Sequence, residues 1–536
     1  MTPPGAREGF TARGERWAVA TPHPYASEAA AGAFANGGNA VDAALHAAVT
    51  LAVVYPHMCG VGGDLFALVQ NPDGKLVAID SSGRAPAGAY PEGLRAANAT
   101  MPDAGPETIT VPGAVGGWDA VHRQGAILPW REAFGAGIEA AQSFPVSRDL
   151  AWSIARRADE LRSDPGFAEV FLADGIPSEG DRLVQPALAR TLRTLAEDGA
   201  GSFYSGELGF RFVDGLRALG APISTDDLDG HTADLLAPLR GRYRDLDVSV
   251  TPPGSQGFVL LEALAAVERL GIDPDPIGSD AATLATILMA ASSDRDRHLA
   301  DPRAMTLHAS DLLDDGHIAA LCDVVLGGLA EHRGSASARH PREPHVPGDT
   351  IALVTADADG WGVSLIQSLF SGFGAGILEP ATGIVAHDRG ACFTLEPGHP
   401  NELAPGKRPA HTLMPVAVHR DGDLVALAGT RGGHGQPQID LMTLVRTFDL
   451  GLDPSDAVAA PRWLVGGMSP LRGDPWIQAE GSVPRSVRAS FGSEGFRVES
   501  LHQADRAVGH AQLLRIDGGV LAAGSDPRAD GGAIAS

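Results

Sequence analysis

The sequence predicts an α+β protein in which layers of β-sheet lie between layers of helices. Helical periodicity dominates the middle of the chain, from about Trp118 to Leu326. Alternating apolar and polar residues, which indicate strands, occur near the start and again after residue 350. A strand with one apolar face must bury that face against another layer. Strands from both ends of the chain are therefore expected to share one core.

The first 80 residues predict two helices followed by a β-hairpin. Ala26–Asn36 is rich in alanine, and Asn39 is placed to cap a second helix that ends near Val54. Alanine and valine dominate this second helix, so we expect it to be buried on most sides. Asn-Pro-Asp-Gly then joins two predicted strands, Leu65–Gln70 and Leu76–Ile79, and this tetrapeptide is a strong hairpin signal.

The middle of the chain predicts amphipathic helices that end in a linker. The helical segments are 148–162, 186–198 and 256–270. Residues 327–348, GGLAEHRGSASARHPREPHVPG, are polar, basic and rich in serine, histidine and proline. Such a composition cannot form a packed core, so we interpret it as an exposed linker.

After the linker the hydrophobic period changes from about 3.6 to 2 residues, as expected where helices give way to strands. Four strands, a helix and two further strands are predicted, in order, at 351–355, 361–367, 413–418, 424–428, 438–448, 495–500 and 512–516. The chain therefore closes as it began, with strands available for the shared core.

Composition excludes several classes of function. A hydrophobic content of 44% with 20% charged residues is typical of a packed globular protein. The formal net charge of −25 repels phosphate backbones and anionic lipids, so we predict neither a nucleic-acid nor a membrane partner. Three scattered cysteines, Cys59, Cys322 and Cys392, suit neither a disulfide framework nor a metal site. No metal and no cofactor are predicted.

The start of the chain predicts a cytoplasmic location. MTPPGAREGFTARGERW lacks the apolar core of a secretion signal. The longest apolar stretch, Ala40–Val54, contains Asp42 and His46 and is shorter than the ~20 residues that a membrane span needs.

Residues 347–360, PGDTIALVTADADG, place a threonine at the start of an apolar strand directly after the linker. If the peptide bond before Thr350 were cut, a free α-amine with a pKa near ~8 would lie beside the threonine hydroxyl. That amine can act as the base for the hydroxyl, so one residue supplies both nucleophile and base. The alternative is a threonine present only for its β propensity.

Six motifs occur in a fixed order along the chain. They are ASEAAAGAFANGGNAVDAALHAAVTLAVVYPHMCGVGGD, PPGSQG, GDTIALVTADADG, FGAGI, PNELAPGKRP and GTRGGHGQPQ. Through them the chain resembles the γ-glutamyltranspeptidase family of N-terminal nucleophile hydrolases over nearly its whole length. The resemblance implies a four-layer αββα sandwich and a precursor that cleaves itself between Asp349 and Thr350 by an N-to-O acyl shift.

The resemblance also implies how the cleaved chain is organised. A large chain of residues 1–349 and a small chain of residues 350–536 would stay associated as one composite domain, and two such pairs can form a homodimer. The substrate would be a small molecule that forms an acyl ester with Thr350. Three other residues match site positions of the family: the oxyanion-binding pair Gly432 and Gly433, and the hydroxyl partner Ser368. His411 and Thr412 stand where the family often has a serine pair that lines the acyl pocket.

Simpler interpretations of these matches stay open. Gly432 and Gly433 also fit an ordinary β-turn, and Ser368 also fits a strand serine bonded to the backbone. Glycine-rich GVGGDL is no dinucleotide-binding loop, because it leads into a predicted strand rather than a helix.

The chain departs from the family where a γ-glutamyl group would bind. Ser82 stands in place of the arginine that clamps the α-carboxylate, and Cys392 in place of the aspartate that binds the α-amino group. A hydroxyl offers one donor instead of a fork, and a thiol cannot balance an ammonium. Glutathione is therefore not the expected substrate. Arg84 and Arg389 are candidates for a displaced carboxylate clamp.

Five segments are instead similar to the oxamate-amidohydrolase-like cytoplasmic branch of the family: GGDLFALV, SSGRAPAGA, RGACFTLEPGHPN, GQPQ and SDPRADGG. Some members of this branch occur in alkylproline antibiotic pathways, which leaves cleavage of a carbon–carbon bond as an alternative reaction. A non-catalytic relative that kept the fold as a binding module is the other alternative.

Overall fold

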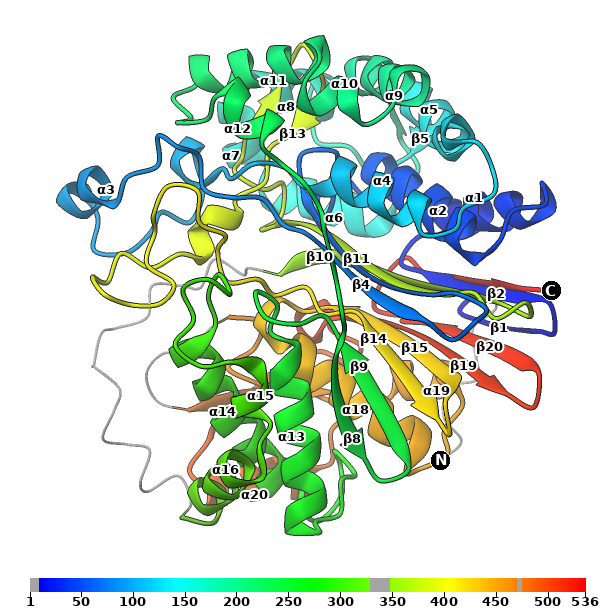
Figure 1. Cartoon of the computed structure of the whole chain (residues 1–536), viewed down its shortest axis with the longest axis vertical. Helices are drawn as coiled ribbons and strands as arrows, with labels where there is room; N and C mark the ends of the chain where they lie inside the picture. Colours follow the sequence, from blue (N-terminus) through cyan, green and yellow to red (C-terminus); the bar gives the residue numbers. More distant parts are fainter. Residues whose placement is uncertain (1–8, 328–347, 470–474) are drawn as a thin grey trace.

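The computed structural model describes residues 9–327, 348–469 and 475–536, which form four layers in the order helix, sheet, sheet, helix (Figure 1). Two seven-stranded sheets stack face to face in the middle. The predicted αββα sandwich is confirmed. The predicted linker lies almost wholly in residues 328–347, outside the described part of the chain.

The first sheet carries the candidate nucleophile. Its strand order is β21-β2-β10-β11-β3-β4-β7, and each neighbouring pair is antiparallel. The strands, in chain order, are β2 (Trp17–Thr21), β3 (Asp64–Gln70), β4 (Leu76–Ser81), β7 (Asp234–Leu236), β10 (Asp349–Asp357), β11 (Gly362–Phe370) and β21 (Gly532–Ala535). β10 and β11 lie between β2 and β3, so both ends of the chain build this sheet, as predicted.

The second sheet has the order β1-β20-β19-β15-β14-β9-β8. Its strands are β1 (Thr11–Gly14), β8 (Leu239–Tyr243), β9 (Leu246–Val250), β14 (Val416–Arg420), β15 (Asp423–Arg431), β19 (His510–Asp517) and β20 (Val520–Ser525). The middle of the chain is mostly helical, as predicted, but β8 and β9 are strands that the prediction did not include. β8 is an edge strand in which Arg240 and Arg242 are exposed, and two arginines in five residues hide its strand character.

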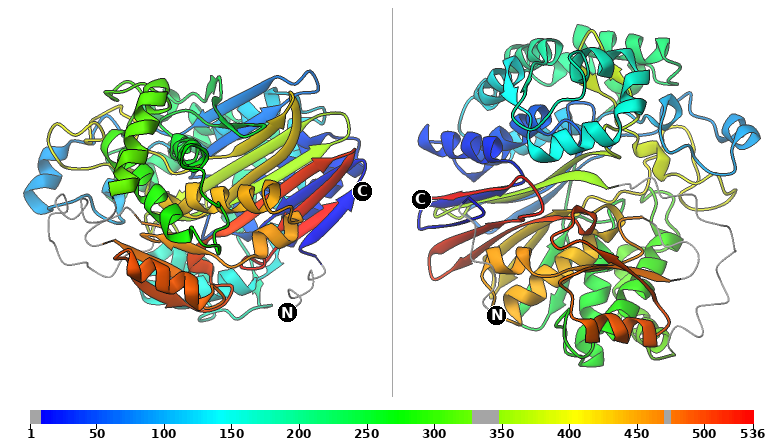
Figure 2. Two further views of the ribbon diagram at one scale, coloured as in Figure 1. Left: turned by 90° about the horizontal axis from the view of Figure 1, so that it is seen from below. Right: turned by 180° about the vertical axis from the view of Figure 1, so that it is seen from behind.

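Helices cover the outer face of each sheet (Figure 2). Those near the first sheet are α1 (Pro24–Ala35), α2 (Ala40–Val54), α4 (Ala114–Arg123), α5 (Gly135–Gln142), α6 (Arg148–Arg156), α7 (Ala158–Ser163), α8 (Pro165–Phe171), α9 (Pro186–Asp198), α10 (Gly201–Tyr204), α11 (Glu207–Ala218) and α12 (Thr225–Asp229). Those near the second are α13 (Gly257–Leu270), α14 (Ala281–His298), α15 (Ala309–Leu312), α16 (Asp315–Gly327), α18 (Gln436–Phe448), α19 (Pro454–Ala459) and α20 (Arg485–Ser493).

The remaining elements are short. Helix α3 (Pro91–Ala97) lies to one side of the layers (Figure 1). Three small sheets contain β5 (Phe144–Pro145), β6 (Arg182–Leu183), β12 (Leu378–Glu379), β13 (Ile384–Val385), β16 (Trp463–Val465), β17 (Trp476–Glu480) and β18 (Arg497–Leu501). The predicted strand at 495–500 is β18, which pairs with β17 rather than with either main sheet.

Local sequence sets where helix α2 begins and how deeply it is buried. The Asn39 side chain accepts hydrogen bonds from the backbone N–H groups of Val41 at 2.9 Å and Asp42 at 3.2 Å, which caps the helix as predicted. Every residue of α2 is buried. The predicted helix at 148–162, by contrast, is divided into α6 and α7 at Arg157.

The apolar core has three levels, one at each junction between layers. The level between the sheets consists mostly of small residues and leucines, including Ala18, Ala356 and Leu427. A smaller group, Phe66, Ala352, Ile366 and Leu413, is formed by residues from β3, β10, β11 and the segment before β14. Among the described helices, none has both the length and the apolar character that crossing a bilayer requires.

Candidate active site

Thr350 is the second residue of β10, in the middle of the first sheet, and is buried. The pairing of β10 with β11 is irregular at this point, because Asp349 pairs with Phe370 while Thr350 pairs with Ser368. Leu369 is thus the extra residue of a bulge. Phe370 has a φ of 77°, a region that bulky residues seldom occupy. The bond between Asp349 and Thr350 therefore lies beside a distorted stretch of backbone.

The Ser368 hydroxyl connects the attacking group to the carbonyl that it would attack. Ser368 Oγ lies 3.0 Å from Thr350 Oγ1 and donates a hydrogen bond to the Asp349 carbonyl oxygen at 2.8 Å. The backbone N–H of Phe370 donates to the same Ser368 oxygen at 2.8 Å. With its own proton directed at Asp349, Ser368 is left to accept the hydrogen bond from Thr350.

Arg389, in the 3-10 helix η3 (Arg389–Cys392), joins two of the other predicted residues to this centre. Its Nη2 lies 3.4 Å from Ser368 Oγ, and its Nη1 donates to Thr412 Oγ1 at 3.0 Å. The guanidinium also stacks on the Phe370 ring at 4.3 Å. Arg389 is completely buried. A chain of contacts therefore runs from Thr350 through Ser368 and Arg389 to Thr412.

Cys392 contributes a neutral thiol to this group. Its sulfur lies 3.7 Å from Arg389 Nη1. Burial raises the pKa of the Cys392 thiol to about 11, although the nearby Arg389 cation acts in the opposite direction. The residue is thus uncharged at neutral pH and does not supply the anion that an α-ammonium group needs. The other substituted position, Ser82, donates its hydroxyl proton to Asp80 at 2.6 Å.

The glycine pair lies where β15 ends and the 3-10 helix η4 (Gly433–Gly435) leads into α18. Gly433 has a φ of 51°, which favours glycine. A Cβ added to Gly348 would lie 3.0 Å from the amide nitrogen of Gly433. The backbone just before the predicted cleavage site is therefore packed against the pair that is predicted to bind an oxyanion.

Gln256, from the PPGSQG motif, connects the segment that contains Thr412 to the glycine pair. The sequence did not predict this role. Its side-chain amide donates to the carbonyl oxygens of Thr412 and Gly433, each at 2.8 Å. Arg295 Nη1 lies 3.3 Å from the Gln256 carbonyl oxygen. One buried amide thus fixes both the acyl-pocket segment and the glycine pair.

Replacing Gln256 with alanine should lower the free energy of unfolding by roughly 1–3 kcal/mol, because two buried carbonyls lose their donor. It should also slow self-cleavage, because Gly433 is no longer fixed. Denaturant unfolding and a time course on gels measure the two effects. Gln185→Ala is a matched control, since Gln185 is buried and donates to the Val53 carbonyl at 2.9 Å. Equal cleavage rates in the two variants would contradict a positioning role for Gln256.

His411 does not contact Thr350 directly but belongs to a buried group around Asp64. The backbone N–H of Leu413 donates to His411 Nδ1 at 3.3 Å, which assigns the ring proton to Nε2, 3.1 Å from Asp64 Oδ2. His387 Nδ1 lies 3.5 Å from the same carboxylate oxygen. Burial and the Arg389 cation lower the pKa of His411 to about 3, so its imidazole is neutral at pH 7.

Asp64 is a buried anion that the sequence did not predict, although it is the last residue of the segment VGGD. Burial alone would raise the pKa of its carboxyl, but His387, His411 and the Arg389 cation outweigh burial and hold that pKa below its ordinary value. The Gly83 backbone N–H donates to the other carboxylate oxygen at 3.1 Å. Asp64 therefore supplies the negative charge that balances Arg389.

Arg84 lies in a different group of charges. Its Nη1 donates to the Gly406 carbonyl at 3.3 Å and lies 3.8 Å from Asp301 Oδ2. The same aspartate binds Arg303. Among the contacts of the described residues, none joins Arg84 to Thr350, and its part in substrate binding stays a prediction.

Arg431, the last residue of β15, binds Asp349, the residue before the predicted cleavage site. Its Nε and Nη2 lie 3.0 and 2.5 Å from Asp349 Oδ1, and Nε is 3.1 Å from the Gly348 carbonyl oxygen. The Gly348 N–H in turn donates to the Phe370 carbonyl at 3.1 Å. Arg431 belongs to the motif GTRGGHGQPQ. Its partner Asp349 lies 82 positions away in the chain, so the sequence alone does not reveal their contact.

Within the described ranges, one set of three potential metal-ligating side chains lies close together: Glu262, Asp294 and His317, on α13, α14 and α16. His317 Nε2 is 3.3 Å from Glu262 Oε1 and 3.0 Å from Asp294 Oδ2. The contact with Glu262 raises the pKa of His317 to about 9, and burial raises the pKa of Glu262 to about 8. A protonated His317 between the carboxyl groups of Glu262 and Asp294 explains why these three side chains lie close together.

These shifts predict a pH-dependent stability. Folding raises both pKa values above the ordinary 6.5 of histidine and 4.5 of glutamate, so the folded state binds more protons than the unfolded state. The contribution of His317 is complete below pH 6.5 and is lost as pH rises through about 9. The free energy of unfolding in urea should therefore fall over this range, and His317→Gln should flatten the fall. An unchanged slope in that variant would contradict the assignment.

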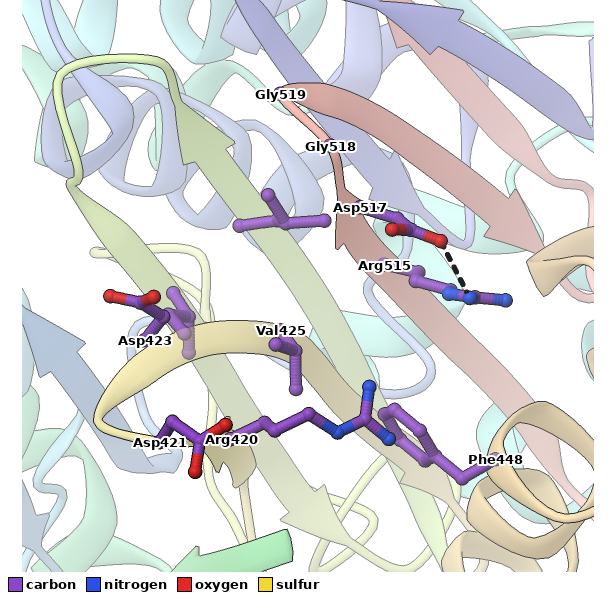
Figure 3. Close-up of a pocket in the computed structure, with 11 residues that line it drawn as sticks. Arg420, Asp421, Asp423, Val425, Phe448, Arg515, Asp517, Gly518 and Gly519 are labelled. Carbon is purple, nitrogen blue, oxygen red and sulfur yellow. Dashed lines mark hydrogen bonds and ion pairs between the residues drawn. The ribbon is translucent and has the colours of Figure 1, made fainter. Parts of the chain in front are cut away.

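A hollow of about 440 Å³ lies at the turns of the second sheet, between β14–β15, β19–β20 and the end of α18 (Figure 3). Arg420 stacks on Phe448 at 5.6 Å, and Arg515 pairs with Asp517 at 2.7 Å. β15 runs from Asp423 at this hollow to Arg431 beside Asp349. The hollow and Thr350 thus lie at opposite ends of the strand, and the hollow belongs to a separate surface.

Comparisons with known proteins give independent information on this geometry. A family profile described as gamma-glutamyltranspeptidase matches residues 26–536. The chain is 37% identical over 525 residues to the oxamate amidohydrolase proenzyme of Klebsiella pneumoniae, covering 96% of this chain and 97% of that protein. It is 30% identical to an acylase ACY 1 proenzyme of Pseudomonas sp., covering 98% and 94%. The crystal structure of cephalosporin acylase from Bacillus halodurans matches with a TM-score of 0.89 and 30% identity over 100% of this chain and 98% of that chain.

Proposed function

Because this chain belongs to the γ-glutamyltranspeptidase family, we propose that it is a proenzyme that cleaves itself between Asp349 and Thr350. The small chain, 350–536, then hydrolyses or transfers a small acyl group through an ester on Thr350. The observation that carries this proposal is the Ser368 hydroxyl, which contacts both Thr350 Oγ1 at 3.0 Å and the Asp349 carbonyl oxygen at 2.8 Å.

Self-cleavage follows from these two contacts. Thr350 Oγ1 attacks the carbonyl carbon of Asp349, and the Ser368 hydroxyl donates to the carbonyl oxygen as negative charge develops there. The bond between the Asp349 carbonyl carbon and the Thr350 nitrogen then breaks, and the nitrogen takes up a proton. Water hydrolyses the resulting ester. The products are a large chain ending at Asp349 and a small chain with a free α-amine on Thr350.

The mature reaction reuses the same hydroxyl with a new base. The α-amine of Thr350 takes the hydroxyl proton as Oγ1 attacks the substrate carbonyl. The backbone N–H groups of Gly432 and Gly433 face the developing oxyanion. The leaving amine takes up the proton, and water or an acceptor amine then cleaves the acyl ester. Thr412, Arg389 and the neutral His411 form the wall of the acyl site.

The substrate is an amide other than glutathione. The Ser82 hydroxyl donates its proton to Asp80, so it does not bind the α-carboxylate of a γ-glutamyl group. The Cys392 thiol is neutral, so it does not balance the charge of the α-ammonium group. The similarity to amidohydrolase and acylase proenzymes supports an amide substrate. Cleavage of a carbon–carbon bond through the same threonine stays a prediction, as do the homodimer and the cytoplasmic location.

Mass spectrometry of the small chain tests this proposal. After brief exposure to candidate amides and keto-acids followed by acid quenching, the small chain should gain the mass of one acyl group, located on Thr350. Release of ammonia or an amine identifies an amide, whereas release of a carbon fragment identifies the alternative reaction. Acylation at any other residue would contradict the role of Thr350, and a chain that binds these compounds without acylation would favour the non-catalytic alternative.

A further inference from the structure

Arg431 presents one edge of its guanidinium to a carboxylate at the candidate active site. Nε and Nη2 form this edge, and both lie against Asp349 Oδ1, at 3.0 and 2.5 Å. The other terminal nitrogen, Nη1, donates to the Arg506 carbonyl at 3.0 Å and lies 3.4 Å from His510 Nε2. Arg431 is 6% exposed. The protein therefore fixes the guanidinium so that the edge formed by Nε and Nη2 faces the Asp349 carboxylate.

Asp349 is the first acyl group that Thr350 would carry. In the proposed self-cleavage, the ester forms between Thr350 Oγ1 and the backbone carbonyl carbon of Asp349. That carbon is followed by Cα, Cβ and the side-chain carboxylate carbon. The first acyl group thus contains a four-carbon skeleton with a terminal carboxylate, as a succinyl group does, and Arg431 binds that carboxylate.

Departure of Asp349 would leave Arg431 buried without its anion. A buried charge that loses its partner is strongly unfavourable, so another carboxylate should bind in its place. The nearby Asp149 is already engaged, because it pairs with Arg506 and accepts a hydrogen bond from Tyr55 at 2.8 Å. Arg431 is then the cation available to a carboxylate on the substrate.

Arg389 is less suited to this role. Its Nη1 is bound to Thr412 and Cys392, its Nη2 contacts Ser368, and its charge interacts with the buried Asp64 anion. Its terminal nitrogens therefore orient protein groups, whereas the fork of Arg431 contacts only the segment that is expected to leave.

We propose that the acyl site selects half-amides of short dicarboxylic acids, with an optimum at the four-carbon succinyl skeleton, and that Arg431 binds the distal carboxylate. This inference rests on the proposed function. In the reaction, Thr350 Oγ1 displaces ammonia from the amide carbon of succinamate to form a succinyl ester. Water then cleaves the ester, giving succinate and regenerating the hydroxyl.

The test is a chain-length series with the processed wild-type enzyme. Initial rates of ammonia release are measured for oxamate, malonamate, succinamate and glutaramate, with succinamide as the neutral isostere of succinamate. We expect kcat/KM to be highest for succinamate and roughly 10- to 100-fold higher than for succinamide, the range that a lost hydrogen bond to a charged group gives. Equal turnover of succinamate and succinamide, or an optimum at another length, would overturn the proposal.

Two variants separate the precursor from the mature site. Asp349→Asn removes the side-chain carboxylate that Arg431 binds before cleavage, so it should slow self-cleavage. Once residue 349 has left the site, the mature enzyme should keep the full preference for succinamate. Arg431→Gln should reduce that preference to about onefold. If Arg431→Gln does not fold or does not cleave itself, the substrate series with the wild-type enzyme still tests the proposal. Rapid acylation of Thr350 by succinamide would defeat only this inference, whereas no acylation by any member of the series would count against the proposed function itself.

Discussion

Thr350→Ala should remain a single chain of 55.3 kDa, whereas the wild-type protein should separate on a denaturing gel into chains of about 36 and about 19 kDa. Self-cleavage and catalysis should both stop, because the variant lacks the oxygen that forms the ester. No other hydroxyl replaces it: the nearby Ser368 proton is directed at the Asp349 carbonyl oxygen, at 2.8 Å. Thr350→Ser keeps a hydroxyl and should still cleave.

Thr355→Ala is the matched control for this substitution. Thr355 lies in the same strand, is completely buried, and donates its hydroxyl proton to the Ala40 carbonyl at 2.7 Å. The control therefore loses a buried hydroxyl in β10 without touching the proposed nucleophile, and it should cleave normally. Two chains from Thr350→Ala, or one uncut chain from an active wild type, would contradict the assignment of Thr350.

Ser368→Ala should slow self-cleavage by roughly 10²- to 10³-fold, the usual cost of removing a donor that stabilises an oxyanion. The variant loses the hydrogen bond to the Asp349 carbonyl and the acceptor for the Thr350 hydroxyl together. Incubation of freshly purified precursor, with samples taken over hours to days, gives the rate from the appearance of the small chain.

Ser364→Ala is the control for Ser368, since Ser364 lies in the same strand and donates to the Ala428 carbonyl at 2.7 Å. Its loss should lower stability without changing the cleavage rate. If Ser368→Ala cleaves as fast as Ser364→Ala, the hydroxyl bridge has no part in the reaction, and the resemblance to the family loses its support at this residue.

Much of the fold follows from local sequence. Asn39 caps α2, Asn-Pro-Asp-Gly joins β3 and β4, and the strand that contains Thr350 forms as expected. The edge strand β8 was missed because Arg240 and Arg242 are exposed and weaken its apolar pattern, whereas β9 alternates apolar and polar residues and could have been predicted. Edge strands depend on pairing with a partner distant in sequence, which no local pattern reveals.

The site could be predicted only in part, for a similar reason. Contacts link Thr350, Ser368, Arg389 and Thr412. Asp64, Gln256 and Arg431 were not predicted, because their contacts join distant segments. Gln256 binds two backbone carbonyls. Every residue has a backbone carbonyl, so the sequence does not show which ones a side chain binds. Arg84 and Arg389 were equivalent candidates, and only the fold shows that they bind different partners.

N-terminal sequencing of the small chain tests the central claim most directly. The account predicts a single new terminus that reads Thr-Ile-Ala-Leu, starting at Thr350. A terminus at any other residue, or the absence of a second chain from catalytically active protein, would contradict it.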